Sequence, residues 1–98
     1  MKVRVARSAI ADLDEIWIYI ATHASVESAE RVVNSLARQF AMLARNPRIG
    51  RARPDIRQDL RSFATGSYRI YYRQESKGVV RILYVRHAAR DEGRLPEA

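Results

Sequence analysis

The chain has 98 residues, of which 47% are hydrophobic, which suits one domain over residues 1–98 and leaves no room for two. It contains no cysteine and only two histidines, His23 and His87, so disulfides, thiolate chemistry and a metal site are not expected. No apolar run approaches the roughly 20 residues of a membrane span, so we expect a cytoplasmic protein without a cofactor.

The net charge of +7 is unevenly distributed along the chain. Basic and acidic side chains balance over residues 1–44, so the whole excess lies from Arg45 onward. All but two of the 18 basic residues are arginine, whose planar guanidinium suits phosphate and carboxylate groups. A genome rich in G and C would also favour arginine, but it would not explain the asymmetry. The distribution indicates an anionic partner, either nucleic acid or an acidic protein.

The N-terminal part predicts a short strand and a first helix. Apolar and polar residues alternate weakly over Lys2–Ala6, as in a strand, and Ser8 is placed to cap the helix that follows. The apolar side chains of this helix form one stripe at helical spacing: Ile10, Leu13, Ile16, Trp17 and Ile20. Ile18 and Tyr19 fall outside the stripe and are expected at the surface.

A second helix is predicted after the break at His23–Ser25, with Ser25 as its cap. Its apolar stripe contains Val26, Ala29, Val33, Leu36, Phe40 and Leu43. Met42 falls outside this stripe, and Asn46–Pro47 ends the helix. The short link predicts an antiparallel helical hairpin whose apolar stripes need a sheet to cover them.

The C-terminal part predicts an exposed basic loop over Arg48–Asp55 and then three strands. The strands span roughly Asp59–Ala64, Tyr68–Gln74 and Val79–His87, and turns at Thr65–Ser67 and Ser76–Gly78 join them. In the middle strand, one face should carry Tyr68, Ile70 and Tyr72 and the other Arg69, Tyr71 and Arg73. In the last strand, Val79, Leu83 and Val85 should alternate with Val80, Ile82 and Tyr84. Both faces of the last strand are therefore apolar, which predicts a central position in the sheet.

The predicted fold class is α+β, with the order β-α-α-β-β-β. We expect the antiparallel helical hairpin to pack on one face of a mostly antiparallel sheet. The other face is then free to carry aromatic rings and arginines.

This order of elements, with its motifs, resembles the RelE/ParE superfamily of toxins from type II toxin–antitoxin modules. The matching segments are AxxDLDEIWxYI, FAMLARNPRIGR, LRSF, YRIYY and RILYVRHAARD, which together span about nine-tenths of the chain. Each segment is weak alone, but they occur in the family's order. The ParE-like branch fits best through NPxxGRxRxD, the LRS strand and the closing HxARD.

The superfamily resemblance implies two different activities. RelE-like members resemble ribosome-dependent mRNA endonucleases that use several basic groups and a C-terminal tyrosine. Arg57 and Arg69 could supply charge here, with Arg61 beside them, but another expected basic position falls on Asp59. The arginine expected after the last strand falls near Ala88, and Gly93–Arg94 stands where the tyrosine is expected. These departures argue against an endonuclease, so no catalytic residue is assigned.

The ParE-like resemblance implies a non-enzymatic inhibitor of DNA gyrase that causes growth arrest and serves plasmid stabilisation. Candidate target-binding residues are Arg57, Arg61, Arg69, Arg73, Arg86, His87 and Arg90. A cognate acidic ParD-like antitoxin is expected to bind in a hetero-oligomeric complex and to make most of its DNA contacts. Candidate antitoxin-binding residues are Ile18, Tyr19, Met42, Arg48, Arg51 and Arg53. A non-toxic nucleic-acid-binding module is a further alternative.

Two groups of side chains allow opposing interpretations. His87 could act as an acid–base group among arginines, or could hydrogen-bond the backbone of a turn or Asp91. The C-terminal tyrosines could stack on bases, but they more often fill a core between sheet and helices. These tyrosines are Tyr68, Tyr71, Tyr72 and Tyr84.

Overall fold

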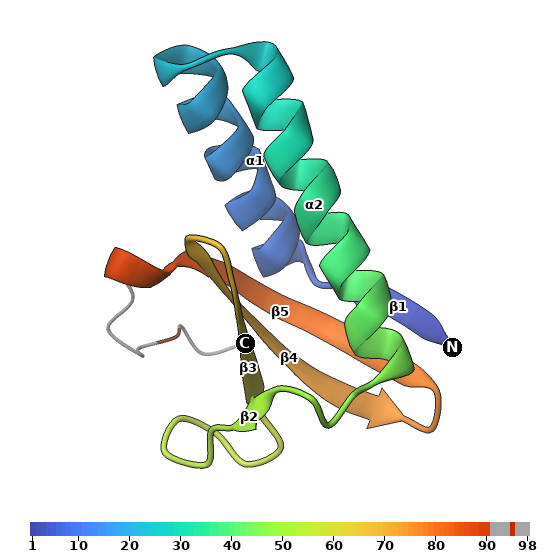
Figure 1. Ribbon diagram of the computed structural model, residues 1–98. Helices are drawn as coiled ribbons and strands as arrows, with labels where there is room; N and C mark the ends of the chain where they lie inside the picture. Colours follow the sequence, from blue (N-terminus) through green and yellow to red (C-terminus); the bar gives the residue numbers. More distant parts are fainter. Residues whose placement is uncertain (91–94, 96–98) are drawn as a thin grey trace.

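The computed structural model describes residues 1–90 and residue 95 (Figure 1). Its elements are β1 (Lys2–Val5), α1 (Arg7–His23), α2 (Val26–Arg45), β2 (Arg51–Ala52), β3 (Arg61–Thr65), β4 (Tyr68–Ser76), β5 (Val79–His87) and a 3₁₀ turn at Ala88–Arg90. The predicted α+β order is confirmed. The two-residue strand β2 lies within the segment that was predicted as a basic loop.

The five strands form one sheet in the order β1-β5-β4-β3-β2. β1 is parallel to β5, and the other neighbours are antiparallel. β5 therefore lies inside the sheet, as its apolar faces predicted. The helical hairpin lies over one face of the sheet (Figure 1), and we call the opposite face the open face.

The first helix begins differently from the prediction. Ala6 occupies the N-cap position without a side-chain hydrogen bond, and Ser8 lies within the first turn. The Ser8 hydroxyl instead donates to the Leu83 carbonyl at 2.6 Å, and the Asp12 carboxylate accepts from the Val85 N–H at 2.9 Å. β1 pairs with only the first half of β5. The Ser8 and Asp12 side chains therefore hydrogen-bond the backbone edge of the second half of β5, which β1 does not reach.

The second helix begins as predicted, because the Ser25 hydroxyl accepts from the Ser28 N–H at 3.0 Å. Glu27 in its first turn adds favourable charge near the positive end of the helix dipole. The helix ends at Arg45, directly before the predicted Asn46–Pro47 stop.

Three helical residues differ from their predicted positions. Ile10 is 48% exposed and Ala9 is buried in its place, because the bonds from Ser8 and Asp12 to β5 fix which side of α1 meets the sheet. Val26 is 50% exposed, because it lies at the tip of the hairpin, away from the sheet (Figure 1). Met42 packs against the core, because the last turns of α2 lie close to the sheet.

Two apolar clusters lie on the two faces of the sheet. The cluster under the hairpin contains Ala9, Leu36, Phe40, Leu43, Ala44, Ile70, Tyr72, Val80, Ile82 and Val85. The cluster on the open face contains Ala6, Leu60, Tyr71, Leu83 and Tyr84, with Ile56 and Leu95 packed against it. The open face is therefore not purely polar, because it has a small core of its own.

A β-bulge changes the alternation of side chains in β5. The pairing between β4 and β5 shifts at Leu83, which has no partner in the register. Ile82 and Val85 consequently belong to the cluster under the hairpin, whereas Leu83 and Tyr84 belong to the open face. The predicted strict alternation, which put Val85 with Leu83, is wrong because it assumed no extra residue.

Candidate functional site

The open face carries buried tyrosine rings covered by arginines. Tyr71 and Tyr84 are almost completely buried in the open-face cluster. The Arg53 guanidinium lies 5.8 Å from the centre of the Tyr71 ring. Arg57 and Arg86 lie 5.8 and 5.1 Å from the centre of the Tyr84 ring. Guanidiniums at these distances attract the ring faces, so the three arginines cover the cluster and add charge above it.

Arg53 has a second contact that limits its freedom. Its Nε and Nη2 donate to Asp55 Oδ1 and Oδ2 at 3.2 and 3.1 Å. This bidentate pair lowers the pKa of Asp55 and raises the pKa of Arg53. Arg53, a candidate for antitoxin binding, is therefore already paired within the chain.

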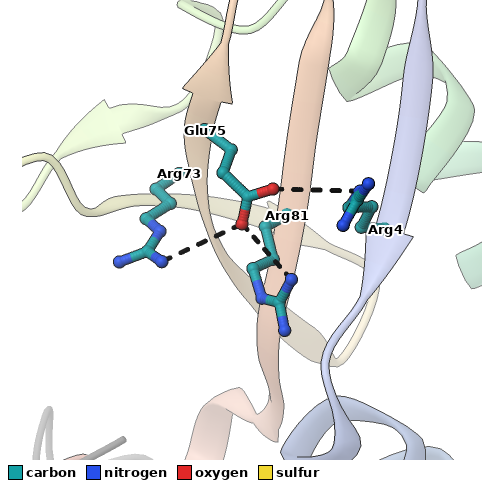
Figure 2. Close-up of polar contacts among 4 residues, drawn as sticks. All are labelled: Arg4, Arg73, Glu75 and Arg81. Atoms are coloured by element: carbon teal, nitrogen blue, oxygen red, sulfur yellow. Dashed lines mark hydrogen bonds and ion pairs between the residues drawn. The ribbon is translucent and has the colours of Figure 1, made fainter.

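Figure 2 shows a cluster that sequence analysis missed: Arg4, Arg73 and Arg81 surround Glu75 on the open face. Glu75 Oε2 lies 3.2 Å from Arg81 Nη1 and 4.0 Å from Arg73 Nη2, and Glu75 Oε1 lies 3.9 Å from Arg4 Nε. Arg73 was a candidate for target binding, but Arg4 and Arg81 were not. Strand alternation places all three on one face, and the signal that was missing is the parallel pairing of β1 with β5.

Arg61 lies apart from the other target-binding candidates. It pairs with Tyr72, whose ring faces the hairpin, and its Nη1 donates to the Gly50 carbonyl at 2.8 Å. The Tyr72 hydroxyl accepts from the Gly50 N–H and donates to the Pro47 carbonyl, both at 2.8 Å. A Cβ at position 50 would collide with the Tyr72 ring, so this position requires glycine. Arg61 and Tyr72 thus fix the basic loop to the sheet.

A cavity of about 570 Å³ lies between α1 and the end of β5, and we call it the groove. It is lined by Asp12, Glu15, Ile16, Tyr19, Ile20, Tyr68, Val85, Arg86, His87 and Arg90. It brings Tyr19, an antitoxin-binding candidate, together with three candidates for target binding. Arg90 lies 6.0 Å from the centre of the Tyr19 ring, which links the two groups directly.

His87 has structural contacts within the groove. Its Nδ1 lies 3.3 Å from the Ala89 N–H, and its ring meets the edge of Tyr68 with centroids 5.5 Å apart. The bond to Ala89 favours the interpretation of His87 as a residue that binds a turn backbone, whereas Asp91 lies outside the described residues. Burial raises the pKa of Tyr68, which keeps its hydroxyl protonated.

Arg86 and Asp12 form an ion pair in the lining of the groove. The Arg86 Nε atom is buried and lies 4.0 Å from Asp12 Oδ2, without a hydrogen-bond partner among the described atoms. Burial raises the pKa of Asp12, and the Val85 N–H and Arg86 offset this only in part. The groove therefore holds an imperfectly satisfied ion pair.

A second cavity of about 380 Å³ lies beside the basic loop. Arg48, Asp59, Arg61 and Gln74 are among its lining residues. Asp59 has a left-handed backbone with φ of 69° and brings a carboxylate beside two arginines. This arrangement weakens the cavity as a phosphate site, in agreement with the sequence argument against an endonuclease.

The remaining candidates lie at the surface. Ile18 and Tyr19 are 59% and 46% exposed on α1, as predicted. Arg51 is exposed in β2, and Arg69 pairs with Arg86 across β4 and β5. Across residues 1–90 and 95, no cluster of three His, Cys, Asp or Glu side chains could hold a metal ion, and no helix is apolar enough over a sufficient length to span a membrane.

Comparison with known proteins places these features in context. Residues 3–92 match the family model described as "ParE toxin of type II toxin-antitoxin system, parDE". Toxin ParE1 of Mycobacterium tuberculosis is 34% identical over 87 residues, which cover 89% of both chains. Toxin ParE1 of Caulobacter vibrioides is 33% identical over 82 residues, covering 83% of this chain and 85% of that one.

Two solved structures share the fold. A chain of the chromosomal ParDE toxin–antitoxin system from P. aeruginosa superposes with a TM-score of 0.74 at 24% identity, covering 89% of this chain and 95% of that chain. A chain of the RelBE2 toxin–antitoxin complex from Mycobacterium tuberculosis superposes with a TM-score of 0.65 at 25% identity, covering 88% and 95%. Both neighbours come from systems that pair a toxin with an antitoxin.

Proposed function

Because the chain belongs to the ParE toxin family of type II toxin–antitoxin systems, we propose that it arrests growth by binding DNA gyrase. It acts without catalysing a reaction of its own, in the cytoplasm. A cognate acidic ParD-like antitoxin neutralises it in a hetero-oligomeric complex and makes most of the contacts to promoter DNA.

The observation that carries this proposal is the composition of the open face. Its arginines lie over buried tyrosines, and the carboxylates among them are already paired: Glu75 with three arginines and Asp55 with Arg53. A general base needs a carboxylate or imidazole within reach of the proton it removes. A face made of paired carboxylates and guanidiniums supports binding to a charged partner and not bond cleavage.

A supercoiling assay tests the gyrase proposal. Purified protein should inhibit supercoiling by gyrase and increase the amount of cleaved DNA, and expression alone should arrest growth and induce the DNA-damage response. The double variant Arg69→Gln/Arg73→Gln on the open face should weaken inhibition on the order of tenfold or more. The control variant Arg31→Gln/Arg38→Gln removes the same charge from exposed positions of the hairpin and should change little. Supercoiling that is unaffected by the purified protein would contradict the proposal.

The hairpin supplies the proposed surface for the antitoxin. Ile18 and Tyr19 are exposed apolar side chains on α1, and the net charge of +7 favours an acidic partner. Tyr19 also borders the groove with Arg86 and Arg90, so apolar and cationic contacts are adjacent there. A segment that folds on binding needs both kinds of contact.

Substitution on α1 tests this surface. Ile18→Asp should weaken capture by the antitoxin on the order of a hundredfold, while the free protein still arrests growth. Val26→Asp is the matched control, because Val26 is similarly exposed but lies at the tip of the hairpin. Unchanged binding by Ile18→Asp, or an equal loss of binding in both variants, would contradict this proposed surface.

A ribosome-dependent mRNA endonuclease is the second candidate. The likeness to a RelBE2 chain favours it, and so does the groove, which brings His87, Arg86 and Arg90 together. Asp12 and Glu15 line the same groove and would repel a phosphate. Cleavage of mRNA on purified ribosomes, abolished by His87→Ala, would establish this alternative in place of gyrase inhibition.

A further inference from the structure

Arg4, Arg81 and Arg73, which we call the arginine row, lie side by side on three adjacent strands. We infer that the arginine row is a binding site for the phosphate backbone of a DNA duplex, and that the Glu75 carboxylate occupies this site in the free protein in place of a phosphate. This goes beyond the proposed function, because it gives the toxin its own contact with DNA whether or not gyrase is the target.

The register of the sheet aligns the three arginines. Arg4 of β1 pairs with Arg81 of β5, and Arg81 pairs with Arg73 of β4. Neighbouring strands lie about 4.8 Å apart, so the row forms one continuous band of positive charge. Like charges directly opposite each other destabilise a sheet. A row of three that breaks this rule is expected where a surface serves a partner and not stability alone.

Glu75 satisfies this row only in part. The register of β4 and β5 shifts between Gln74 and Ser76, which leaves Glu75 at a β-bulge. Its carboxylate hydrogen-bonds Arg81 at 3.2 Å, whereas Arg4 and Arg73 lie at 3.9 and 4.0 Å (Figure 2). Two carboxylate oxygens cannot satisfy three guanidinium forks, so the cluster keeps donors and a net charge of +2, three arginines less one glutamate.

The surroundings of the arginine row favour phosphates over an acidic protein segment. An acidic segment that folds on binding needs apolar anchors beside its charges, because burial of these anchors offsets the entropy lost on ordering. Among residues 1–90 and 95, and apart from Met1 at the N-terminus, the large exposed apolar residues lie on the hairpin or in the basic loop: Ile10, Ile18, Tyr19, Val26 and Ile49. The open face therefore offers charge with few such anchors.

The tyrosines of the open face favour a duplex over a single strand. Proteins that bind single strands stack bases on exposed aromatic rings. Tyr71 and Tyr84 are buried beneath arginines, so their rings are covered. Contacts from arginine to backbone phosphates fix the position of a duplex and carry no base sequence. We therefore expect binding to duplex DNA without sequence preference.

The experiment measures binding of the isolated toxin to a random-sequence DNA duplex of about 25 base pairs by fluorescence anisotropy over a range of salt. The triple variant Arg4→Gln/Arg73→Gln/Arg81→Gln should bind on the order of 10 to 100 times more weakly. Its slope of log affinity against log salt should fall by roughly 2 to 3, because each lost phosphate contact removes about 0.9. The control Arg31→Gln/Arg38→Gln/Arg45→Gln removes equal charge from α2 and should change the slope by less than about 1. Equal loss in the two variants would overturn the proposal in favour of net charge alone.

A gain of affinity provides a test that a folding defect cannot imitate. Glu75→Gln removes the competing carboxylate and should strengthen duplex binding several-fold at low salt. Glu27→Gln makes the same charge change on α2 and should have little effect. Unchanged binding by Glu75→Gln would overturn the proposal.

Other polyanions identify the partner. Polyglutamate, single-stranded DNA and an RNA duplex should each bind more weakly than the DNA duplex at equal charge. Equal or tighter binding of any of them would overturn the assignment to duplex DNA. Gyrase is absent from these measurements, so their failure would leave the supercoiling result standing.

Discussion

The two faces of the sheet are covered in different ways, as the adjacent residues Tyr71 and Tyr72 show. Both side chains are fully buried. Tyr72 lies under the hairpin, where apolar side chains surround its ring and its hydroxyl bonds Gly50 and Pro47. Tyr71 lies on the open face, where the Arg53 guanidinium covers its ring. A second layer of structure buries one face, whereas charged side chains cover the other and remain able to meet a partner.

This difference predicts that stability depends mainly on the hairpin side. Leu43→Ala removes a fully buried side chain there and should lower the free energy of unfolding by about 3 kcal/mol. Urea denaturation measures this loss. A loss below about 1 kcal/mol would contradict the expectation that stability depends mainly on the hairpin side.

Tyr72→Phe is expected to have the next largest effect. It removes the hydroxyl that accepts from the Gly50 N–H and leaves that buried donor without its partner. We expect a loss of about 1 to 2 kcal/mol by urea denaturation, together with faster proteolysis of the basic loop. An unchanged midpoint would mean that water replaces the hydroxyl.

Arg57→Gln on the open face should cost less. Loss of its contact with the Tyr84 ring is worth about 0.5 to 1 kcal/mol. If Arg57 also contacts gyrase, inhibition of supercoiling should fall much more than stability. A stability loss as large as that of Leu43→Ala would break the distinction between the two faces.

Asp12→Asn should give the smallest effect, and that effect should depend on pH. Burial raises the pKa of Asp12 above its ordinary value of 3.8, so the folded protein holds this proton to higher pH than the unfolded chain. The stability that protonated Asp12 contributes is fully present below pH 3.8, its ordinary pKa, and is lost as the pH rises through the raised pKa of the folded protein. Relative to Asp12→Asn, the natural protein should therefore lose stability from about pH 4 upward. Urea denaturation from pH 3.5 to 7 checks the sign, and a constant difference would contradict it.

Much of the fold was predictable because its signals are local. The Ser25 cap and the Asn46–Pro47 stop each act within a few residues, and both were confirmed. The apolar stripe of α2 was confirmed at Ala29, Leu36, Phe40 and Leu43 but was wrong at Val26. The errors arose from contacts between distant segments. Ser8 looked like a helix cap but bonds Leu83, 75 positions along the chain. The extra residue at Leu83 depends on how β4 meets β5, which the sequence of either strand does not reveal.

The candidate site was predictable in composition but not in arrangement. The sequence indicated an arginine-bearing face, and Arg57, Arg73 and Arg86 lie on it. The sequence could not show that Arg61 lies apart from these three arginines, because a shift of one position in strand alternation changes the face that a side chain meets. The arginine row depends on the parallel pairing of β1 with β5, which joins residues nearly 80 positions apart.

The bonds from Ser8 and Asp12 to β5 have a consequence for the free toxin. A strand edge with open N–H and C=O groups is a template for pairing with another chain and for aggregation. Here α1 occupies part of that edge, and β2, at the far side of the sheet, is only two residues long. These features disfavour self-association of the sheet through its edges.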